Sequence, residues 1–238
     1  MRSGPEWFIF IETLGIVSFA INAMIVAKDR GLSTLGVFVC AFATALGGGT
    51  LRDILLGPEA HPFFWVAFPF YIVAIFVLAL AYANLGGVRA VIARRDVLIK
   101  ESAEMLALAS LGALGAAKAF NILSPLVGTG LLAMAQLWIL CAFMGAISAA
   151  FGGILRDTLI NEMPGALRPG VWVLEAVFIG AGVLVALRMA DVPQPWTVLA
   201  GFIVTLAIRA PVVWKTQAKN KQAGMTPATT RAEPKRKE

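Results

Sequence analysis

The sequence predicts an all-α integral membrane protein with seven transmembrane helices. Of its 238 residues, 59% are hydrophobic and only 14% are charged, and the mean hydropathy is +0.81. A soluble domain of this size could not cover so much apolar surface with so few charges. The chain also contains a series of apolar runs, each about 20 residues long, which is the length needed to cross a bilayer. An internal repeat, described below, indicates how these runs are arranged.

Seven runs are long and apolar enough to span. They are Trp7–Ala27, Leu35–Leu56, Phe63–Leu85, Val97–Ala119, Leu131–Ile160, Val171–Ala190 and Trp196–Trp214. The third contains no charged residue. The second and fifth differ from the others, because in each an apolar half is followed by glycines and then by an Arg-Asp pair.

These glycine motifs are copies of one element. The first is Gly47-Gly48-Gly49-Thr50-Leu51-Arg52-Asp53 and the second is Phe151-Gly152-Gly153-Ile154-Leu155-Arg156-Asp157. Upstream, Glu12 and Lys28 of the first span are matched by Glu104 and Lys118 of the fourth. The two copies therefore indicate a duplicated functional element within a longer internal repeat.

The repeat predicts inverted topology. Each unit holds three spans, an odd number, so the second unit must enter the membrane from the opposite face, related by a pseudo-two-fold axis in the membrane plane. We expect residues 6–90 to form the first three-helix repeat and residues 96–190 the second. Residues 195–214 would then form the seventh helix, and residues 215–238 a basic, disordered cytoplasmic tail.

The distribution of Lys and Arg predicts the orientation. With seven spans, four of the 20 basic residues fall on one side of the membrane and sixteen on the other. Short loops rich in Lys and Arg stay in the cytoplasm. We therefore expect the N-terminus outside and the C-terminus inside, in the plasma (inner) membrane of a prokaryote. The basic tail is suited to bind anionic lipids, and nothing indicates nucleic-acid binding.

The glycines allow two interpretations. Glycine lets a helix kink or unwind and frees carbonyl oxygens, which is tolerated in a membrane beside protein or a water-filled cavity. Small residues also let helices pack closely. The glycines occur twice, each time beside an Arg-Asp pair, and this favours a pore over close helix packing alone. The candidate pore and kink residues are Gly47, Gly48, Gly49, Phe151, Gly152 and Gly153, and Phe151 is a candidate constriction.

The charged residues of the motifs are the next candidates. Buried in a bilayer, Arg52, Asp53, Arg156 and Asp157 would each cost at least about 2.5 kcal/mol on insertion scales, so they are expected to pair or to face a cavity. Neighbouring residues diverge by about 100° around a helix. We therefore expect crossed pairs, Arg52 with Asp157 and Arg156 with Asp53. These pairs would either line a pore or only hold the helices together.

Lys118 is a lone basic residue in an apolar stretch. Its default interpretation is a cation that complements a helix C-terminus and reaches toward the interface. Gating by repulsion of cations and binding of lipid phosphate are the alternatives.

Enzymatic chemistry has no support in the sequence. Phosphate-binding loops, nucleophile elbows and zinc-protease motifs are absent, the two cysteines are far apart, and His61 is the only histidine. We therefore predict a protein that is not an enzyme and that has no cofactor and no bound metal.

With Leu35–Phe38 leading into Ala45–Asp53, and with Gly152–Asp157 repeating the pattern, the sequence resembles prokaryotic members of the trimeric intracellular cation (TRIC) channel family. The same sequences are also grouped as a glycine-transporter family. The resemblance covers residues 6–209. It implies a homotrimer with one pore per protomer, lined by the second and fifth helices kinked at their glycines. It also implies passage of monovalent cations, chiefly potassium.

We therefore expect a passive potassium channel with little discrimination against sodium, in which ions pass transiently near Gly48, Gly49, Gly152 and Gly153. A secondary transporter of glycine or another small zwitterion is the alternative, and a structural membrane protein without flux is a third possibility. One departure from the pattern is that the connection between the fourth and fifth spans, Asn121–Gln136, is expected to be expanded, with Gly128-Thr129-Gly130 as a flexible extracellular loop.

Overall fold

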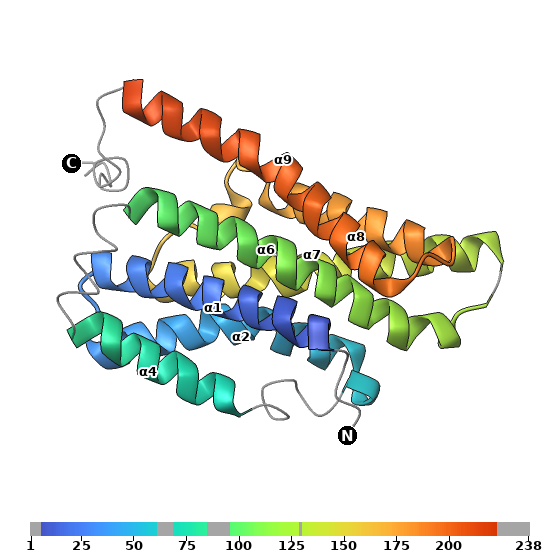
Figure 1. Ribbon diagram of the computed structural model, residues 1–238, viewed down its shortest axis with the longest axis horizontal. Coiled ribbons are helices and arrows are strands. Elements are labelled where there is room, and N and C mark those ends of the chain that lie inside the picture. Colours follow the sequence, from blue (N-terminus) through green and yellow to red (C-terminus); the bar gives the residue numbers. More distant parts are fainter. Residues whose placement is uncertain (1–5, 61–68, 85–95, 129, 223–238) are drawn as a thin grey trace, which may run out of the picture.

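The computed structural model describes residues 6–60, 69–84, 96–128 and 130–222, and all the regular structure in these ranges is helical. Its seven α-helices are α1 (Glu6–Asp29), α2 (Thr34–Leu56), α4 (Phe70–Asn84), α6 (Asp96–Leu123), α7 (Leu131–Leu159), α8 (Val173–Met189) and α9 (Gln194–Gln222). They run roughly along the long axis of the molecule (Figure 1). The predicted all-α membrane fold with seven helices is confirmed.

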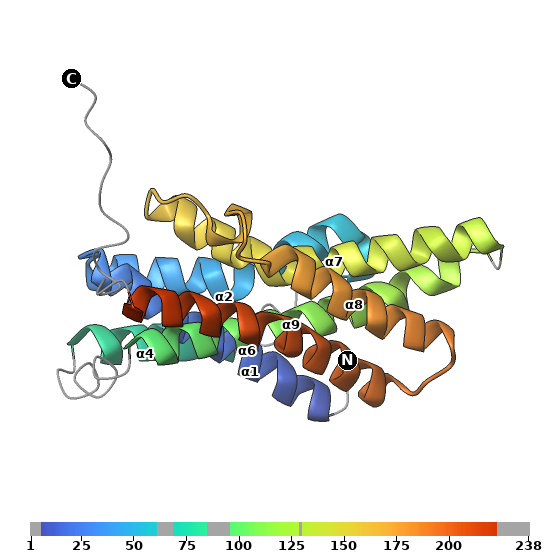
Figure 2. The same ribbon diagram turned by 90° about the horizontal axis from the view of Figure 1, so that it is seen from above.

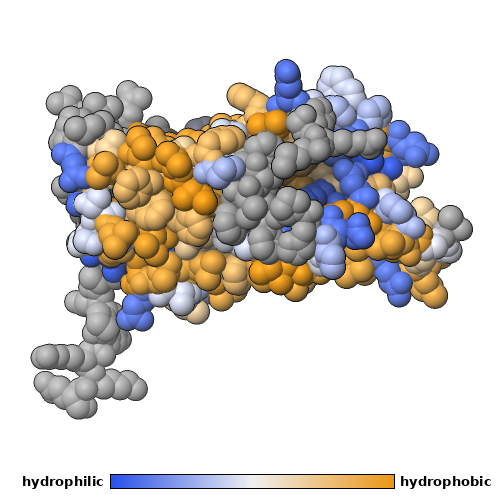
Figure 3. All heavy atoms as spheres, turned by 90° about the horizontal axis from the view of Figure 1, so that it is seen from below, coloured by the Kyte–Doolittle hydropathy of each residue, from blue (hydrophilic) through white to orange (hydrophobic). Residues whose placement is uncertain are grey.

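Five of these helices have the length and apolarity to cross a membrane: α1, α2, α6, α7 and α9. The apolar helix α4 is shorter, at 15 residues, and α8 has 17 residues. The predicted third span, Phe63–Leu85, lies partly outside the described residues, because the structure describes it only from residue 69 to residue 84. Figure 3 shows apolar side chains over much of one face of the molecule, with hydrophilic residues gathered toward its two ends, as a membrane protein requires.

The two repeats pack through equivalent helices. Helix α1 packs against α6, and α2 packs against α7, while α4 lies beside α1 and α2 and α9 lies beside α6 and α8. Figure 1 places α4 and α9 at opposite edges of the bundle, and Figure 2 shows α2 and α7 together on one side of it. Because each central helix contacts its own counterpart, a pseudo-two-fold axis passes through the centre of the molecule.

The packing partners show that this axis inverts the repeats. Gly15 of α1 packs against Leu111 of α6, and Asn22 of α1 hydrogen-bonds the carbonyl of Lys100, so the partner's number falls as α1 advances. Helices α1 and α6 are therefore antiparallel. The glycine crossings described below establish the same relation for α2 and α7. The inverted repeat is thus confirmed, whereas the exact boundaries of the repeats stay a prediction.

Local sequence fixes the turn between α1 and α2. Gly31 adopts φ +73°, a left-handed conformation that glycine tolerates without steric cost. Ser33 then caps α2, where its hydroxyl accepts a hydrogen bond from the backbone N–H of Gly36 at 3.3 Å. A serine cap satisfies one of the free N–H groups at the start of a helix. These residues end α1 and begin α2 within a few positions, which holds the two helices side by side.

Two expectations about helix ends need correction. The connection between the fourth and fifth spans is not an expanded loop, because α6 continues to Leu123, a 3-10 turn follows at Ser124–Leu126, and α7 begins at Leu131. Residue 129 lies outside the described residues. Similarly, α9 continues to Gln222 instead of ending near Trp214, because the residues that follow favour helix and contain neither glycine nor proline. Residues 223–238 of the predicted tail lie outside the described residues.

Candidate functional site

The glycine motifs mark the crossing of α2 and α7. A Cβ atom added to Gly48 would collide with the carbonyl oxygen of Ser148, and one added to Gly152 would collide with that of Thr44. Both collisions involve backbone, which cannot move aside as a side chain can. Glycine at these positions therefore lets the two helix backbones touch, as small residues do in membranes.

The two contacts are related by the internal repeat. Thr44 and Ser148 are 104 residues apart, and so are Gly48 and Gly152. Gly48 contacts Ser148, which is the counterpart of Thr44 in the second repeat, and Gly152 contacts Thr44 itself. A two-fold axis generates this reciprocal pattern. Along α2 the contacts run from Thr44 to Gly48, while their partners along α7 run back from Gly152 to Ser148. The two helices therefore cross antiparallel.

The predicted helix breaks are not observed. Helix α2 runs unbroken from Thr34 to Leu56, and α7 from Leu131 to Leu159, through all the glycines of both motifs. The physical reason is that an unwound segment would free backbone groups in a region without water, which costs several kcal/mol for each group, whereas glycine in a helix costs only about 1 kcal/mol. The glycines serve the close approach of two intact helices.

The remaining motif glycines differ in their surroundings. A Cβ on Gly47 would meet the side chain of Leu155, whereas one on Gly153 would meet only the end of Arg156, at 4.0 Å. Gly49 is buried, and Phe151 is half-buried in α7. The motifs are thus alike at the crossing itself and differ on either side of it.

The first polar cluster centres on Asp53, whose side chain is fully buried. Arg52 donates from Nε to Asp53 Oδ1 at 2.8 Å, and its Nη2 lies 2.6 Å from the same oxygen. Lys118 of α6 also donates to this oxygen, at 2.8 Å, and to the carbonyl of Ala60 at 3.4 Å. Arg52 Nη1 reaches Ser148 of α7 at 3.3 Å. One carboxylate thus binds two cations that come from different repeats.

Glu12 of α1 adds a second acidic group to this cluster. It is 8% exposed and lies within electrostatic range of Arg52, Lys118 and Asp53. Two cationic and two acidic side chains therefore face one another where α1, α2 and α6 meet. Their formal charges balance, which is how buried charges are tolerated in a membrane protein.

The second polar cluster centres on Arg156. Its Nε donates to Asp157 Oδ1 at 2.8 Å, and its Nη1 donates to the side-chain oxygen of Asn22 on α1. Its Nη2 lies 3.8 Å from a carboxylate oxygen of Glu104 on α6. Asp157 Oδ2 accepts the backbone N–H of Gly165 at 2.7 Å, which ties the turn after α7 to the cluster.

The predicted crossed pairs are wrong. Arg52 binds Asp53 and Arg156 binds Asp157, in each case through Nε and Oδ1 at 2.8 Å. The 100° divergence of neighbouring residues describes the Cβ directions only. An arginine side chain is long enough to fold back along the helix, so its guanidinium reaches the carboxylate of the next residue.

The predicted position of Lys118 also needs correction. Helix α6 ends five residues after it, at Leu123, so Lys118 does not lie at a helix C-terminus. Its side chain is 24% exposed and turns into the bundle toward Asp53. The structure thus brings Lys118 into the first glycine motif's cluster, whereas its counterpart Lys28 lies in the last turn of α1.

Two polar residues of the site carried no signal in the motifs: Ser148 and Asn22. Ser148 could have been found from the 104-residue offset, which pairs it with Thr44. Glu12 was indicated by its match with Glu104, and each glutamate lies near the arginine of its own repeat. Asn22 belongs to no repeated pair that we recognised. Among the described residues, no group of three or more His, Cys, Asp and Glu side chains is placed to hold a metal ion.

Comparison with known proteins identifies the family. The model of the glycine-transporter family matches residues 9–86 and 101–189, which include both glycine motifs and both polar clusters. The chain belongs to this family. Two related proteins are the inner membrane protein YadS of Escherichia coli K12 and a membrane protein of Vibrio cholerae, both UPF0126 proteins. The first is 29% identical over 86% of this chain and 91% of its own length, and the second is 30% identical over 84% and 76%.

Solved structures connect the family to TRIC cation channels. A TRIC orthologue from Rhodobacter sphaeroides, described as a trimeric intracellular cation channel, is 28% identical, covers 89% of this chain and all of its own, and has a TM-score of 0.74. A second TRIC cation channel, also 28% identical, covers 85% of this chain and 91% of its own with a TM-score of 0.69. The glycine-transporter family member described here thus has the fold of the TRIC channels. The predicted family resemblance is confirmed, and these structural neighbours are channels, not enzymes.

Proposed function

We propose that this protein is a passive channel for monovalent cations, chiefly potassium, and that it works as a homotrimer with one pathway in each protomer. The observation that carries the proposal is the buried Asp53, which holds two cations between inverted repeats in the fold of a cation channel. Ionisable groups buried within membrane proteins are rare, and ion pathways are one of the functional sites that they mark.

The pathway proposed here runs beside the crossing of α2 and α7. Because the helices are intact, it is lined by side chains of the clusters and not by carbonyl oxygens of a broken helix. Asp53 Oδ1 already accepts Arg52 and Lys118, while Oδ2 is buried and has no hydrogen-bond partner within the described residues. A permeant cation would compete with the Lys118 ammonium for this carboxylate.

The gate of the proposed channel is therefore the Lys118–Asp53 ion pair. Lys118 is the member of the cluster that can move, because it is partly exposed and holds a flexible side chain, whereas Arg52 is 4% exposed. When Lys118 withdraws, a negative charge becomes available to an entering cation. We further propose that the N-terminus lies outside, that the C-terminus is cytoplasmic, and that the protein resides in the inner membrane.

A potassium flux assay tests the proposal. Protein reconstituted in planar bilayers should give ohmic potassium currents, and Lys118→Met should raise the open probability, whereas Lys118→Arg should not. Lys28→Met is the matched control, since Lys28 holds the equivalent position in the first repeat. A silent bilayer, or a Lys118→Met current equal to that of the unchanged protein, would contradict the proposal.

The second candidate is a secondary transporter of glycine, the activity that the description of the family names. An arginine is the natural partner of an amino-acid carboxylate, but both motif arginines are buried, and the Nε of each is already bound to the adjacent aspartate. Uptake of labelled glycine into liposomes separates the two candidates. Saturable, ion-coupled uptake supports the transporter, and ohmic current without uptake supports the channel.

A further inference from the structure

The turn that follows α7, residues 160–172, lies between the second polar cluster and α9. Its 3-10 helix, Gly165–Leu167, packs against both α7 and α8. We propose that Arg209 of α9 is a positioning residue, which fixes this turn and, through the turn, the carboxylate of Asp157. The inference rests on the channel function proposed above, because it gives the seventh helix control of cation binding at the second cluster.

Arg209 is a fully buried cation in an apolar helix. Its side chain is 2% exposed, and its Nη1 donates to the carbonyl oxygen of Val171, two residues before α8 begins. Its Nε is buried and has no hydrogen-bond partner within the described residues. A charge is costly to bury, and an ionisable side chain inside a membrane protein is a candidate functional residue. What this one holds is the turn after α7.

A continuous series of hydrogen bonds leads from Arg209 to the second cluster. After the bond from Arg209 to Val171, the N–H of Val171 donates to the carbonyl of Arg168 at 3.4 Å. The N–H of Arg168 donates to the carbonyl of Gly165 at 3.2 Å. The N–H of Gly165 in turn donates to Asp157 Oδ2 at 2.7 Å, while the other carboxylate oxygen accepts the motif arginine at 2.8 Å. Each contact thus orients the next, from α9 to the carboxylate.

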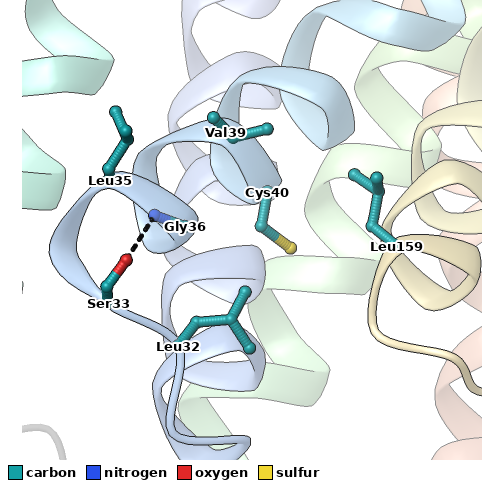
Figure 4. Close-up of a pocket in the computed structure, with 7 residues that line it drawn as sticks. All are labelled: Leu32, Ser33, Leu35, Gly36, Val39, Cys40 and Leu159. Atoms are coloured by element: carbon teal, nitrogen blue, oxygen red, sulfur yellow. Dashed lines mark hydrogen bonds between the residues drawn. The ribbon is translucent and has the colours of Figure 1, made fainter.

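The opposite side of the turn is less firmly held. An open pocket of about 280 Å³ separates the end of α7 from the start of α2, and Figure 4 shows Leu159 facing Cys40 across it. Beyond Leu159, Glu162 pairs with Arg30 in the turn after α1. The side chain of Arg30 is 32% exposed, and exposed ion pairs contribute little. The buried contact with Arg209 is therefore the stronger anchor.

The first cluster is held in a different way. The turn after α2, with its 3-10 helix Pro58–Ala60, meets that cluster where the carbonyl of Ala60 accepts Lys118 of α6 at 3.4 Å. A helix of the opposite repeat thus contacts that turn, whereas α9, which contacts the turn after α7, belongs to neither repeat. Figure 1 shows α9 at the edge of the bundle beside α6 and α8. The seventh helix gives the second repeat an anchor of its own.

The orientation of Asp157 determines how strongly the second cluster binds a cation. With the turn fixed, one carboxylate oxygen is bound to Arg156 and the other to the N–H of Gly165, and Glu104 is the further acid that attracts an ion. When the turn is released, Oδ2 can bind potassium without displacing an N–H donor. The ion is then held by two carboxylates and leaves more slowly. Arg209 therefore keeps binding weak enough for passage, as conduction requires.

Hydrogen–deuterium exchange of the intact protein in detergent tests the link to the turn. Arg209→Met keeps a long side chain but removes the donor, so residues 160–172 should exchange about tenfold faster, which corresponds to about 1.4 kcal/mol. Arg209→Lys retains a donor and should exchange like the unchanged protein. Thr205→Val is the matched control, because Thr205 is buried one turn earlier and its hydrogen bond stays within α9. Unchanged exchange in Arg209→Met would overturn the proposal.

Single-channel conductance, measured against potassium concentration, tests the effect on ion binding. Arg209→Met should lower the half-saturating potassium concentration about tenfold, the effect of one hydrogen bond to a charged group. Gly165→Pro removes the N–H that Asp157 accepts while α9 stays intact, and proline fits the first position of a helix, so it should have the same effect. Thr205→Val should leave this concentration unchanged.

The double variant shows whether Arg209 acts through the turn. Adding Arg209→Met to Gly165→Pro should change the half-saturating concentration no further, because both substitutions break one series of contacts. A further tenfold change in the double variant would refute the proposal, and so would an Arg209→Met curve equal to that of the unchanged protein. A silent bilayer with the unchanged protein would refute the channel function and the effect on ion binding together. The exchange measurement separates that outcome from a failure of Arg209 to fix the turn.

Discussion

The helix crossing makes a sharp prediction about three glycines that look equivalent in the sequence. Gly48→Ala and Gly152→Ala each introduce a methyl group that collides with a backbone carbonyl of the opposite helix. Overpacking of this kind costs about 1–3 kcal/mol, because the helices must separate to admit the methyl group. Gly153→Ala meets only the end of Arg156 at 4.0 Å, an ordinary contact. It should be neutral or stabilising by up to about 1 kcal/mol, since alanine is the better helix former.

Thermal unfolding in detergent, followed by tryptophan fluorescence, measures the difference. For a chain of this size, 1 kcal/mol corresponds to about 2–4 °C in Tm, so Gly48→Ala and Gly152→Ala should each lower Tm by about 2–12 °C. The double variant should lose less than the sum of the two, because helices already separated by one methyl group admit the second more easily. If Gly48→Ala tolerated heating as well as Gly153→Ala, the reasoning from the crossing would be refuted.

Three further predictions follow from single contacts. Asp53→Asn leaves the buried Arg52 and the partly exposed Lys118 without their carboxylate and should destabilise the protein by about 3 kcal/mol in detergent unfolding. Adding Lys118→Met should recover part of that loss, and no recovery would argue against the ion pair. Asn22→Leu removes the acceptor of Arg156 and the donor to the carbonyl of Lys100, which should lower the free energy of unfolding by about 2–3 kcal/mol. Chemical denaturation measures this loss, and an unchanged midpoint would refute it. Trp138→Phe keeps an aromatic ring against Phe178 but loses the hydrogen bond to the carbonyl of Gly182, so Tm should fall by an amount equivalent to about 1 kcal/mol. Trp196→Phe, at a position that is 66% exposed, is the control and should leave Tm unchanged.

The sequence alone predicted the architecture well, because hydrophobic length and the parity of the spans are global properties. Six of the seven predicted spans match observed helices to within a few residues at most ends, and the inverted relation follows from having three spans in each repeat. Helix ends were less predictable where the sequence stays compatible with helix beyond the apolar core. Thus α9 passes Trp214 and α6 continues to Leu123, whereas α7 begins at Leu131 as predicted.

The site was predicted in composition but not in pairing. The motif arginines and aspartates do lie together in buried clusters, yet the choice of partner depends on side-chain length and on which helices meet. Lys118 reaches Asp53 across 65 residues of sequence, and nothing in either motif indicates that contact. Asn22 was missed because a single asparagine in an apolar helix has no repeated counterpart to draw attention to it.

The two clusters have the same arrangement of helices but different charge, and this difference bears on the proposed channel. In the first, Lys118 from the second repeat joins Arg52 and Asp53, and Glu12 balances it. In the second, Arg156 faces both Asp157 and Glu104, which leaves one formal negative charge in excess. In the proposed channel, a cation approaching the second cluster would be attracted without any rearrangement, whereas at the first it would have to displace an ammonium. On this proposal one repeat supplies an open entrance and the other supplies one that can close.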